Sequence, residues 1–207
     1  MPSESHLPIP RSLLLGCAVE LARRGRRHVA AALLLGFDCY LRHSDLKWLR
    51  VSDVSFPGDP RLQVPGLGAV FIFNTKAGRK QWVPIRCPLA IGLLRTLVWG
   101  RRPSDFLFGP DRHGLLAGFR FGQRCLGIGG RFVMHSLRHG GASYDFIRGV
   151  PMDKIIIRGR WSGLAVTRRY IQESQALVLE LSVPQAVLAK VKLYTESEAV
   201  TRRWLGL

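Results

Sequence analysis

Residues 135–139 read His-Ser-Leu-Arg-His, and this short stretch carries the strongest signal in the sequence. The pattern around it predicts a helix over 135–147, in which His135 and Arg138 stand three residues apart and project from one face. The N-terminus of a helix also directs unpaired N–H groups and a partial positive charge outward. Imidazole, guanidinium and helix dipole together favour the binding of a phosphate oxygen. The same pattern also occurs without a binding site, where His135 only begins a helix and Arg138 is solvated.

A second stretch, further along the chain, places an aromatic residue among arginines. Arg158-Gly159-Arg160-Trp161-Ser162 is followed, nine residues after Trp161, by Tyr170 within Thr167-Arg168-Arg169-Tyr170-Ile171. Packing of the ring is the commoner fate of such a tyrosine. A phenol, with its ordinary pKa of about 10, attacks phosphorus only where cations stabilise both the phenolate and the attacked phosphate.

Two further basic sites lie in the N-terminal half. Arg42 stands between two predicted helices, and Asp45, three residues later, is placed to cap or orient the second helix. Thr75-Lys76-Ala77-Gly78-Arg79-Lys80 is predicted to form a hairpin tip, with Lys76 entering the turn and Arg79 and Lys80 leaving it. Most basic hairpin tips are solvated turns, but this shape also suits a DNA groove or a backbone oxygen.

The hydrophobic periodicity predicts one mostly helical domain with a small antiparallel sheet inserted early, an α+β fold. Helices are expected over 13–22, 28–41, 43–49, 88–99, 114–125, 135–147, 151–158, 163–172 and 175–193. Strands are expected over 51–56, 69–75 and 81–85, and Gly25 is expected to end the first helix. Residues 1–12 form a predicted loose leader, 13–193 the domain, and 194–207 a C-terminal tail.

The composition is globular and strongly basic. The 207 residues contain 31 basic and 14 acidic side chains, which give a net charge of +17 and a pI near 11.1. This charge favours a polyanionic partner, nucleic acid or an anionic membrane surface, over small neutral metabolites. A merely solubilising basic surface is the alternative. Most of the basic residues are arginines, which suits bidentate phosphate contacts.

The cysteines and the apolar segments bear on the compartment. The four cysteines are spread without a CxxC pair or zinc-type spacing, which predicts reduced, buried thiols in an intracellular protein. The apolar run 29–41 contains Asp38 and is too short to cross a bilayer. We therefore expect neither a membrane segment nor a metal site.

Taken together, these positions resemble the catalytic domain of the tyrosine recombinases, the phage integrase family. The resemblance extends from about His28 to Gln172. Six functional positions of the family match in order: Arg42, Lys76, His135, Arg138, Trp161 and Tyr170. Asp45 and His139 match two supporting positions beside them.

The resemblance implies DNA cleavage and rejoining through a covalent 3′-phosphotyrosyl intermediate, without a cofactor, metal or ATP. Arg42 and Arg138 would bind the non-bridging oxygens, and His135 would assist proton removal from the phenol and contact the phosphate. Trp161 would donate its indole N–H to a phosphate oxygen, and Lys76 would protonate the departing 5′-hydroxyl. The expected partner is double-stranded DNA, and the further residues expected to contact it are Arg79, Lys80, Arg160, Arg168 and Arg169.

The sequence departs from the family pattern in two places. Many relatives carry an additional N-terminal DNA-clamping domain, whereas fewer than thirty residues precede the resemblance here. Another chain or an omitted segment supplies that half of the clamp, or this basic domain binds DNA alone. Gly140-Gly141 stands where relatives carry larger residues, and two glycines are expected to cost this helix about 2 kcal/mol relative to alanines.

Several alternatives stay open at this point. The apolar helix over 175–193 is expected to pack either on a neighbouring protomer, giving self-association on DNA, or on its own domain. The resemblance favours an active strand transferase. The alternatives are an inactive recombinase-derived DNA-binding module and a type IB topoisomerase-like enzyme. An RNA-binding protein is less favoured, because no RNP-type aromatic strand is present. The expected localisation is intracellular and DNA-associated, in a nucleus or a nucleoid according to the host.

Overall fold

Two adjacent apolar helices form the centre of the molecule. The computed structural model describes residues 7–62, 66–73, 81–172, 178–179 and 182–207. Helix α1 (Arg11–Arg23) and helix α2 (Arg27–Asp38) are buried on nearly every side, over 13–22 and 29–37 respectively. Helices that are apolar all round belong to a core. Gly25, with φ of 74°, makes the turn between the two helices, which confirms the predicted helix end.

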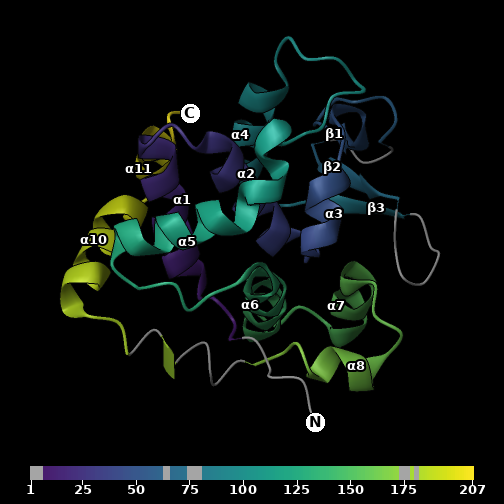
Figure 1. The fold of residues 1–207 in the computed structure, drawn as a ribbon. Helices are drawn as coiled ribbons and strands as arrows, with labels where there is room; N and C mark the ends of the chain where they lie inside the picture. Colours follow the sequence, from purple (N-terminus) through teal and green to yellow (C-terminus); the bar gives the residue numbers. More distant parts are fainter. Residues whose placement is uncertain (1–6, 63–65, 74–80, 173–177, 180–181) are drawn as a thin grey trace.

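Longer helices from later in the described chain pack around this central pair (Figure 1). They are α4 (Pro88–Val98), α5 (Leu115–Leu126), α6 (Met134–Ile147), α10 (Gln185–Thr195) and α11 (Glu198–Leu205). The predictions over 88–99, 114–125 and 135–147 agree with α4, α5 and α6 to within one residue at each end. Within the described part of the chain, no helix is long and apolar enough to cross a membrane.

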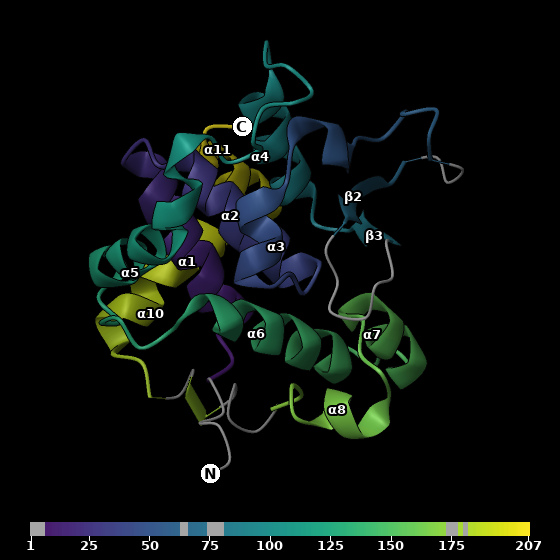
Figure 2. The ribbon, with the colours of Figure 1, turned by 45° about the vertical axis from the view of Figure 1, so that its right-hand side comes forward.

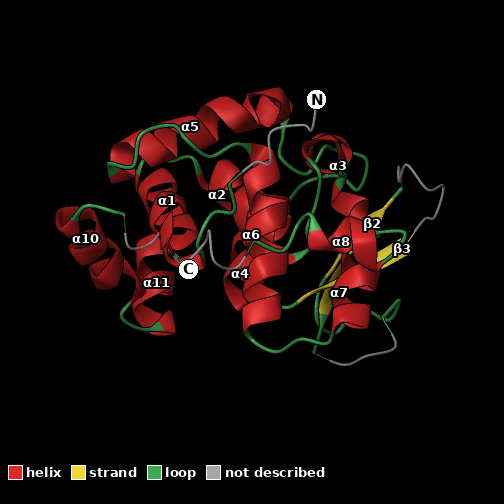
Figure 3. Ribbon diagram, turned by 90° about the horizontal axis from the view of Figure 1, so that it is seen from below, coloured by secondary structure: helices red, strands yellow, loops and turns green. Residues whose placement is uncertain are grey.

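A small antiparallel sheet with the order β1-β2-β3 lies at one edge of the helices (Figure 3). Its strands are β1 (Val54–Ser55), β2 (Gly68–Ile72) and β3 (Gln81–Ile85), and Val70 pairs with both Val54 and Val83. The strand predicted over 51–56 is wrong in its first half. A 3₁₀ turn, η1 (Val51–Asp53), forms there because the Asp53 carboxylate accepts the Arg50 backbone N–H at 2.8 Å.

Three short helices complete the side of the molecule that carries the sequence motifs. Helix α3 (His43–Trp48) follows α2, and helices α7 (Met152–Gly159) and α8 (Leu164–Arg168) lie beyond the end of α6 (Figure 2). The helix predicted over 163–172 therefore ends early, before Tyr170. A second, smaller core of Tyr40, Ala142, Ile155 and Trp161 joins these elements.

Both ends of the described chain are packed more tightly than the sequence predicts. The loose leader expected over 1–12 is wrong from Pro8 onward, because Pro8, Ile9 and Pro10 are buried and the Ile9 N–H donates to the Ser136 carbonyl at 3.2 Å. The helix expected over 175–193 does not run through, because Pro184 has no N–H to donate and α10 starts directly after it.

The C-terminal helices pack on the same chain. Glu20 is fully buried in α1 and accepts a hydrogen bond from Tyr194 Oη at 2.8 Å, while Lys190 of α10 forms an ion pair with the same carboxylate. Burial alone raises the pKa of Glu20, but the hydrogen bonds from Lys190 and Tyr194 outweigh it and lower the pKa below its ordinary value. In the described part of 175–193, α10 therefore packs on its own domain.

The glycine pair after the histidine motif has a packing role. A Cβ on Gly140 would lie 2.3 Å from the Ile9 carbonyl oxygen, and one on Gly141 would lie 2.1 Å from the Phe37 carbonyl oxygen. No side chain fits at either position, because the obstacle is backbone. Both glycines permit the close contact of α6 with α2 and with the segment before α1, a packing role that the sequence analysis did not predict.

The cysteines agree only in part with the prediction of buried thiols. All four are free, but Cys87 and Cys125 are half-buried, whereas Cys17 and Cys39 are fully buried. Burial raises the pKa of the Cys17 and Cys39 thiols, which keeps both protonated and unreactive at neutral pH.

Candidate active site

Helix α6 presents three of the predicted site residues on one face of its first turns. His135, Arg138 and His139 follow the i, i+3, i+4 spacing, and the two imidazole rings are 5.1 Å apart between centroids. The Val133 N–H donates to Ser136 Oγ at 3.1 Å and so fixes the start of the helix. His135 is half-buried, His139 is nearly buried and Arg138 is fully buried.

The Arg138 guanidinium is held by backbone carbonyls from two distant elements. Its Nη1 donates to the Tyr40 carbonyl at 2.5 Å, and its Nη2 donates to the Gly159 carbonyl at the end of α7. Burial, and then the neighbouring charges of Arg160 and Arg42, lower the pKa of Arg138 to about 9. The group is thus a buried cation at neutral pH, crowded by other cations, and a bound anion would relieve that repulsion.

Tyr170 lies in the middle of this group although it comes from a different segment. Its ring centroid is 4.7 Å from that of His139, 4.6 Å from that of Trp161 and 5.6 Å from that of His135. The guanidinium carbon of Arg138 stands 5.1 Å from the Tyr170 ring centroid. The segment is fixed from α6, because Ser143 Oγ accepts the Gln172 N–H at 2.8 Å and donates to the Tyr170 carbonyl.

Trp161 forms one wall of the site. Its ring stacks on Tyr40, with 5.8 Å between centroids, and lies 4.6 Å from the Arg138 guanidinium. A Cβ on Gly159 would lie 2.1 Å from the indole, so this position needs glycine for the ring to fold back over α7. Within the described residues, the buried indole Nε1 has no hydrogen-bond partner, and it is therefore available to a ligand oxygen.

Arg42 and Asp45 stand at the start of α3, beside this group. The Arg42 N–H donates to Asp45 Oδ2 at 2.9 Å, so the predicted capping role of Asp45 agrees with the structure. The half-buried Arg42 side chain is near enough to Arg138 for its charge to lower the pKa of Arg138. Five of the six matched positions, and both supporting residues, are therefore gathered in one region.

The remaining predicted residues divide into three cases. Lys76, Arg79 and Lys80 lie outside the described residues. Arg168 and Arg169 are exposed beside the site, as a DNA contact requires. Arg160 does not fit its predicted role as a DNA contact, because its side chain is only 3% exposed and forms an ion pair with Asp45 at 3.3 Å.

Sequence reasoning missed a set of polar contacts that lie behind the site. Tyr40 Oη donates to the Asp145 carboxylate, which also pairs with Arg86 at 3.2 Å. Asp38 pairs with Arg158 at 3.2 Å. Asp145 stands seven residues after Arg138, two helical turns along the same face. This spacing could have indicated that Asp145 lies on the same side of α6 as the site. Tyr40 carried no comparable signal.

Burial and local charge also act on the carboxylate behind the site. Burial raises the pKa of Asp38 above its ordinary value, although the charge of Arg158 and the backbone N–H groups of Arg86 and Cys87 act in the opposite direction. Among the described residues, no three His, Cys, Asp or Glu side chains are grouped in a way that would hold a metal ion. The site is made instead of guanidinium, imidazole, indole and phenol groups.

The arrangement of these elements is similar to that of two recombinases of known structure. The structure of XerA recombinase superposes with a TM-score of 0.62 at 17% sequence identity, over 95% of this chain and 66% of that one. The XerH site-specific recombinase, bound to its difH substrate in a pre-cleavage complex, gives a TM-score of 0.58 at 14% identity, over 86% of this chain and 54% of that one. The chain thus spans less than two thirds of either protein, and the likeness establishes the fold.

Comparison of the sequence alone gives no further relative. No protein-family model matches the chain, and no curated protein matches it. The shared fold and the gathered side chains therefore support the resemblance noted in the sequence independently of sequence similarity.

Proposed function

We propose that the protein cleaves and rejoins DNA strands through a covalent 3′-phosphotyrosyl intermediate on Tyr170. One observation carries this proposal: a half-buried phenol ring stands 5.1 Å from a fully buried guanidinium and within 6 Å of two imidazoles and an indole. A phenol becomes nucleophilic only in such cationic surroundings. Simple ring packing does not require a buried arginine beside it.

The charges of the site suit a phosphodiester. Three guanidiniums, those of Arg42, Arg138 and Arg160, stand around one carboxylate, that of Asp45, so the site has an excess of positive charge. A phosphodiester carries one negative charge, and more charge develops as phosphorus becomes pentacoordinate. Preorganised cations therefore bind the transition state more strongly than the ground state.

The proposed step balances as a transesterification. Tyr170 Oη forms a bond to phosphorus while the bond from phosphorus to the 5′-oxygen breaks. His135 accepts the phenolic proton, and Lys76 supplies a proton to the departing 5′-oxygen. Rejoining is the reverse reaction, in which a DNA 5′-hydroxyl attacks phosphorus and Tyr170 leaves. The ester bond is exchanged rather than hydrolysed, so the balance needs no external energy source.

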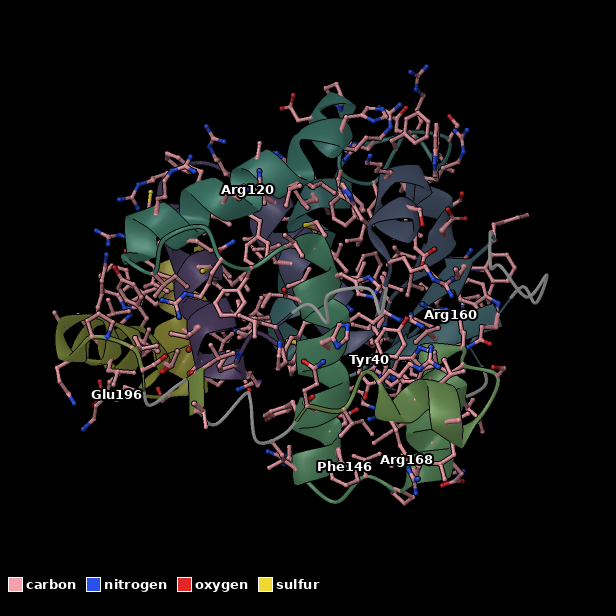
Figure 4. All side chains as sticks on the ribbon, turned by 60° about the horizontal axis from the view of Figure 1, so that its bottom comes forward. Tyr40, Arg120, Phe146, Arg160, Arg168 and Glu196 are labelled. Carbon is pink, nitrogen blue, oxygen red and sulfur yellow. The ribbon has the colours of Figure 1, made fainter. Side chains whose placement is uncertain are left out.

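The surface charge supports a DNA duplex as the substrate. Arg168 (labelled in Figure 4) and Arg169 are exposed on the short helix and turn that lead directly to Tyr170, where they suit phosphates next to the one attacked. With a net charge of +17, the protein is expected to bind DNA with a strong dependence on salt. We further propose an intracellular, DNA-associated protein that self-associates on its substrate.

A nicked suicide duplex tests the proposal. Cleavage near the nick releases a short oligonucleotide, so religation fails and a covalent protein–DNA adduct accumulates that survives denaturation. We expect an adduct with the wild type and none with Tyr170→Phe, while both proteins retain DNA binding. An adduct undiminished in Tyr170→Phe contradicts the nucleophile, and a wild type that binds but forms no adduct indicates the inactive DNA-binding module.

A supercoiled plasmid distinguishes the two active alternatives. A type IB topoisomerase-like enzyme relaxes any supercoiled plasmid in the absence of a partner site. A site-specific recombinase forms its adduct efficiently only on duplexes that carry its own sequence. Efficient relaxation of unrelated plasmids at low protein concentration therefore favours the topoisomerase reading.

A further inference from the structure

Two residues other than glycine have a left-handed backbone in the described part of the chain, and they contact each other. Tyr40, between α2 and α3, has φ of 48°, and Arg160, at the end of α7, has φ of 55°. This conformation is unfavourable for any residue with a Cβ, and helix ends of this kind usually carry glycine. Arg160 Nη2 donates to the Tyr40 carbonyl at 3.0 Å. Strained positions that meet at one contact, beside a candidate site, point to a functional constraint.

The Tyr40 carbonyl is a shared acceptor for two guanidiniums. Arg138 Nη1 donates to the same oxygen at 2.5 Å, so this one atom fixes the positions of both arginines relative to α3. The side chains of Tyr40 and Arg160 are labelled in Figure 4. The left-handed turn aims the carbonyl into the site instead of along α2. The turn is held from its other end, because Tyr40 Oη donates to Asp145 on α6.

Arg160 also reaches the element that carries the other arginine of the site. Its Nη2 forms an ion pair with Asp45 Oδ2 at 3.3 Å, and the same oxygen accepts the Arg42 N–H at 2.9 Å. The side chains of Arg160 and Asp45 are 3% and 1% exposed. The ion pair is therefore inside the protein and cannot contact DNA directly.

We propose that Arg160 is a positioning residue, which holds the Tyr40 carbonyl and Asp45 so that Arg138 and Arg42 present their guanidiniums to the same phosphate. The inference rests on the proposed function for the identity of that phosphate, but the geometry it explains is present in the free protein. A residue that only ended α7 would be glycine, since glycine adopts this backbone without strain. The buried, paired guanidinium is the reason for an arginine at this position.

The test compares Arg160→Met with Arg158→Met. Arg158 is a matched control, because its side chain is equally buried, lies in the last turn of α7, which Arg160 ends, and forms its own ion pair with Asp38 at 3.2 Å. It donates to Asp38, and although its guanidinium lies 5.6 Å from the Tyr40 ring centroid, it donates neither to the Tyr40 carbonyl nor to Asp45. Loss of a buried ion pair alone therefore affects both variants similarly. Arg160→Gly is a second variant that relieves the backbone strain, so the helix end still forms.

Two measurements on these variants separate positioning from folding. In single-turnover cleavage of the suicide duplex at saturating protein, we expect Arg160→Met to be 10- to 100-fold slower than Arg158→Met, with DNA affinities within about threefold. A neutral methylphosphonate at the scissile position carries less negative charge for the guanidiniums to stabilise. The difference in cleavage rate between the two variants should then shrink at least fivefold. Equal rates for the two variants on the phosphodiester, or a difference that is undiminished on the methylphosphonate, would overturn the positioning role.

A third measurement does not depend on cleavage. Inorganic phosphate is titrated into each free protein and its binding is followed by ³¹P line broadening. We expect Arg160→Met and Arg160→Gly to bind phosphate at least tenfold more weakly than the wild type, and Arg158→Met to bind within about twofold. If the wild type forms no adduct but this pattern holds, the proposed function fails and the positioning role stands. If wild-type cleavage occurs and phosphate binding is unchanged in Arg160→Met, the positioning role fails alone.

Discussion

Replacing Arg138 by methionine removes the charge of the site while keeping a long apolar side chain in its place. The guanidinium carbon stands 5.1 Å from the Tyr170 ring and 4.6 Å from the Trp161 ring, so no solvent layer separates it from the reacting groups. The variant should fold, because burial and neighbouring cations already make the charged form of Arg138 unfavourable, as its lowered pKa indicates. The Tyr40 carbonyl also keeps its hydrogen bond from Arg160.

The expected effect on the rate follows from this geometry. A unit charge about 5 Å from a developing negative charge contributes about 3 kcal/mol at an effective dielectric constant of about 20. That energy corresponds to a rate about 150-fold lower, and removal of one oxyanion donor typically costs about 10²- to 10³-fold. We therefore expect Arg138→Met to cleave about 10²- to 10³-fold more slowly than the wild type.

The assay is single-turnover cleavage of the suicide duplex at saturating protein, with DNA affinity measured separately by fluorescence anisotropy. DNA affinity should fall only several-fold, because at most one phosphate contact among many is lost. Arg148→Met is the matched control, since it removes an exposed arginine just beyond the end of the same helix. A cleavage rate of Arg138→Met within threefold of the wild type would refute the argument, as would a rate loss explained entirely by weaker binding.

Three further predictions concern packing, pH and salt. Gly141→Ala should lower the free energy of unfolding by about 3 kcal/mol, because its Cβ would meet the Phe37 carbonyl oxygen at 2.1 Å. Gly130→Ala, which has open space around it, should change the free energy of unfolding by less than about 0.5 kcal/mol. Denaturant titration measures both values, and equal values would contradict the packing role of Gly141. The pKa of Glu20 is lowered in the folded state, so its contribution to stability is present above the unfolded pKa and is lost as the pH falls below it. Glu20→Gln should therefore destabilise the protein at pH 7 and flatten the loss of stability below about pH 4.5. Parallel curves of unfolding free energy against pH for the wild type and the variant would contradict this. Replacement of both Arg168 and Arg169 by alanine should make the slope of log affinity against log salt shallower by about 1.8 while leaving the single-turnover rate at saturation within threefold; an unchanged slope would remove them from the DNA contact.

Local sequence patterns were sufficient to predict features that lie within a single helix. The three-residue spacing of His135 and Arg138 correctly predicted a shared helix face, and the apolar residues at helical spacing correctly predicted the helices α1 and α2. These features depend on the period of a helix, which is readable from neighbouring residues. The placement of Tyr170 beside them came from the resemblance to a family, because no local rule brings a turn after α8 to the face of α6.

Features that depend on contacts between distant segments could not be read in the same way. Arg160 was predicted as a surface arginine that contacts DNA. Its guanidinium is buried because it pairs with Asp45 and the Tyr40 carbonyl, which are more than a hundred residues away in the sequence. Glu20 carried no sign that it anchors α10, since its partner Tyr194 is 174 residues away. Gly141 looked like a weak helix position because its neighbour, the Phe37 carbonyl, belongs to another helix.

Identification of the residue bonded to DNA tests the central claim most directly. The wild-type adduct from the suicide duplex is digested with a nuclease and a protease, and the peptide that retains a nucleotide is sequenced by mass spectrometry. The account predicts a single modified peptide, with the 3′-phosphate of the nucleotide on the oxygen of Tyr170. A nucleotide on any other side chain, with Tyr170 unmodified, would contradict it.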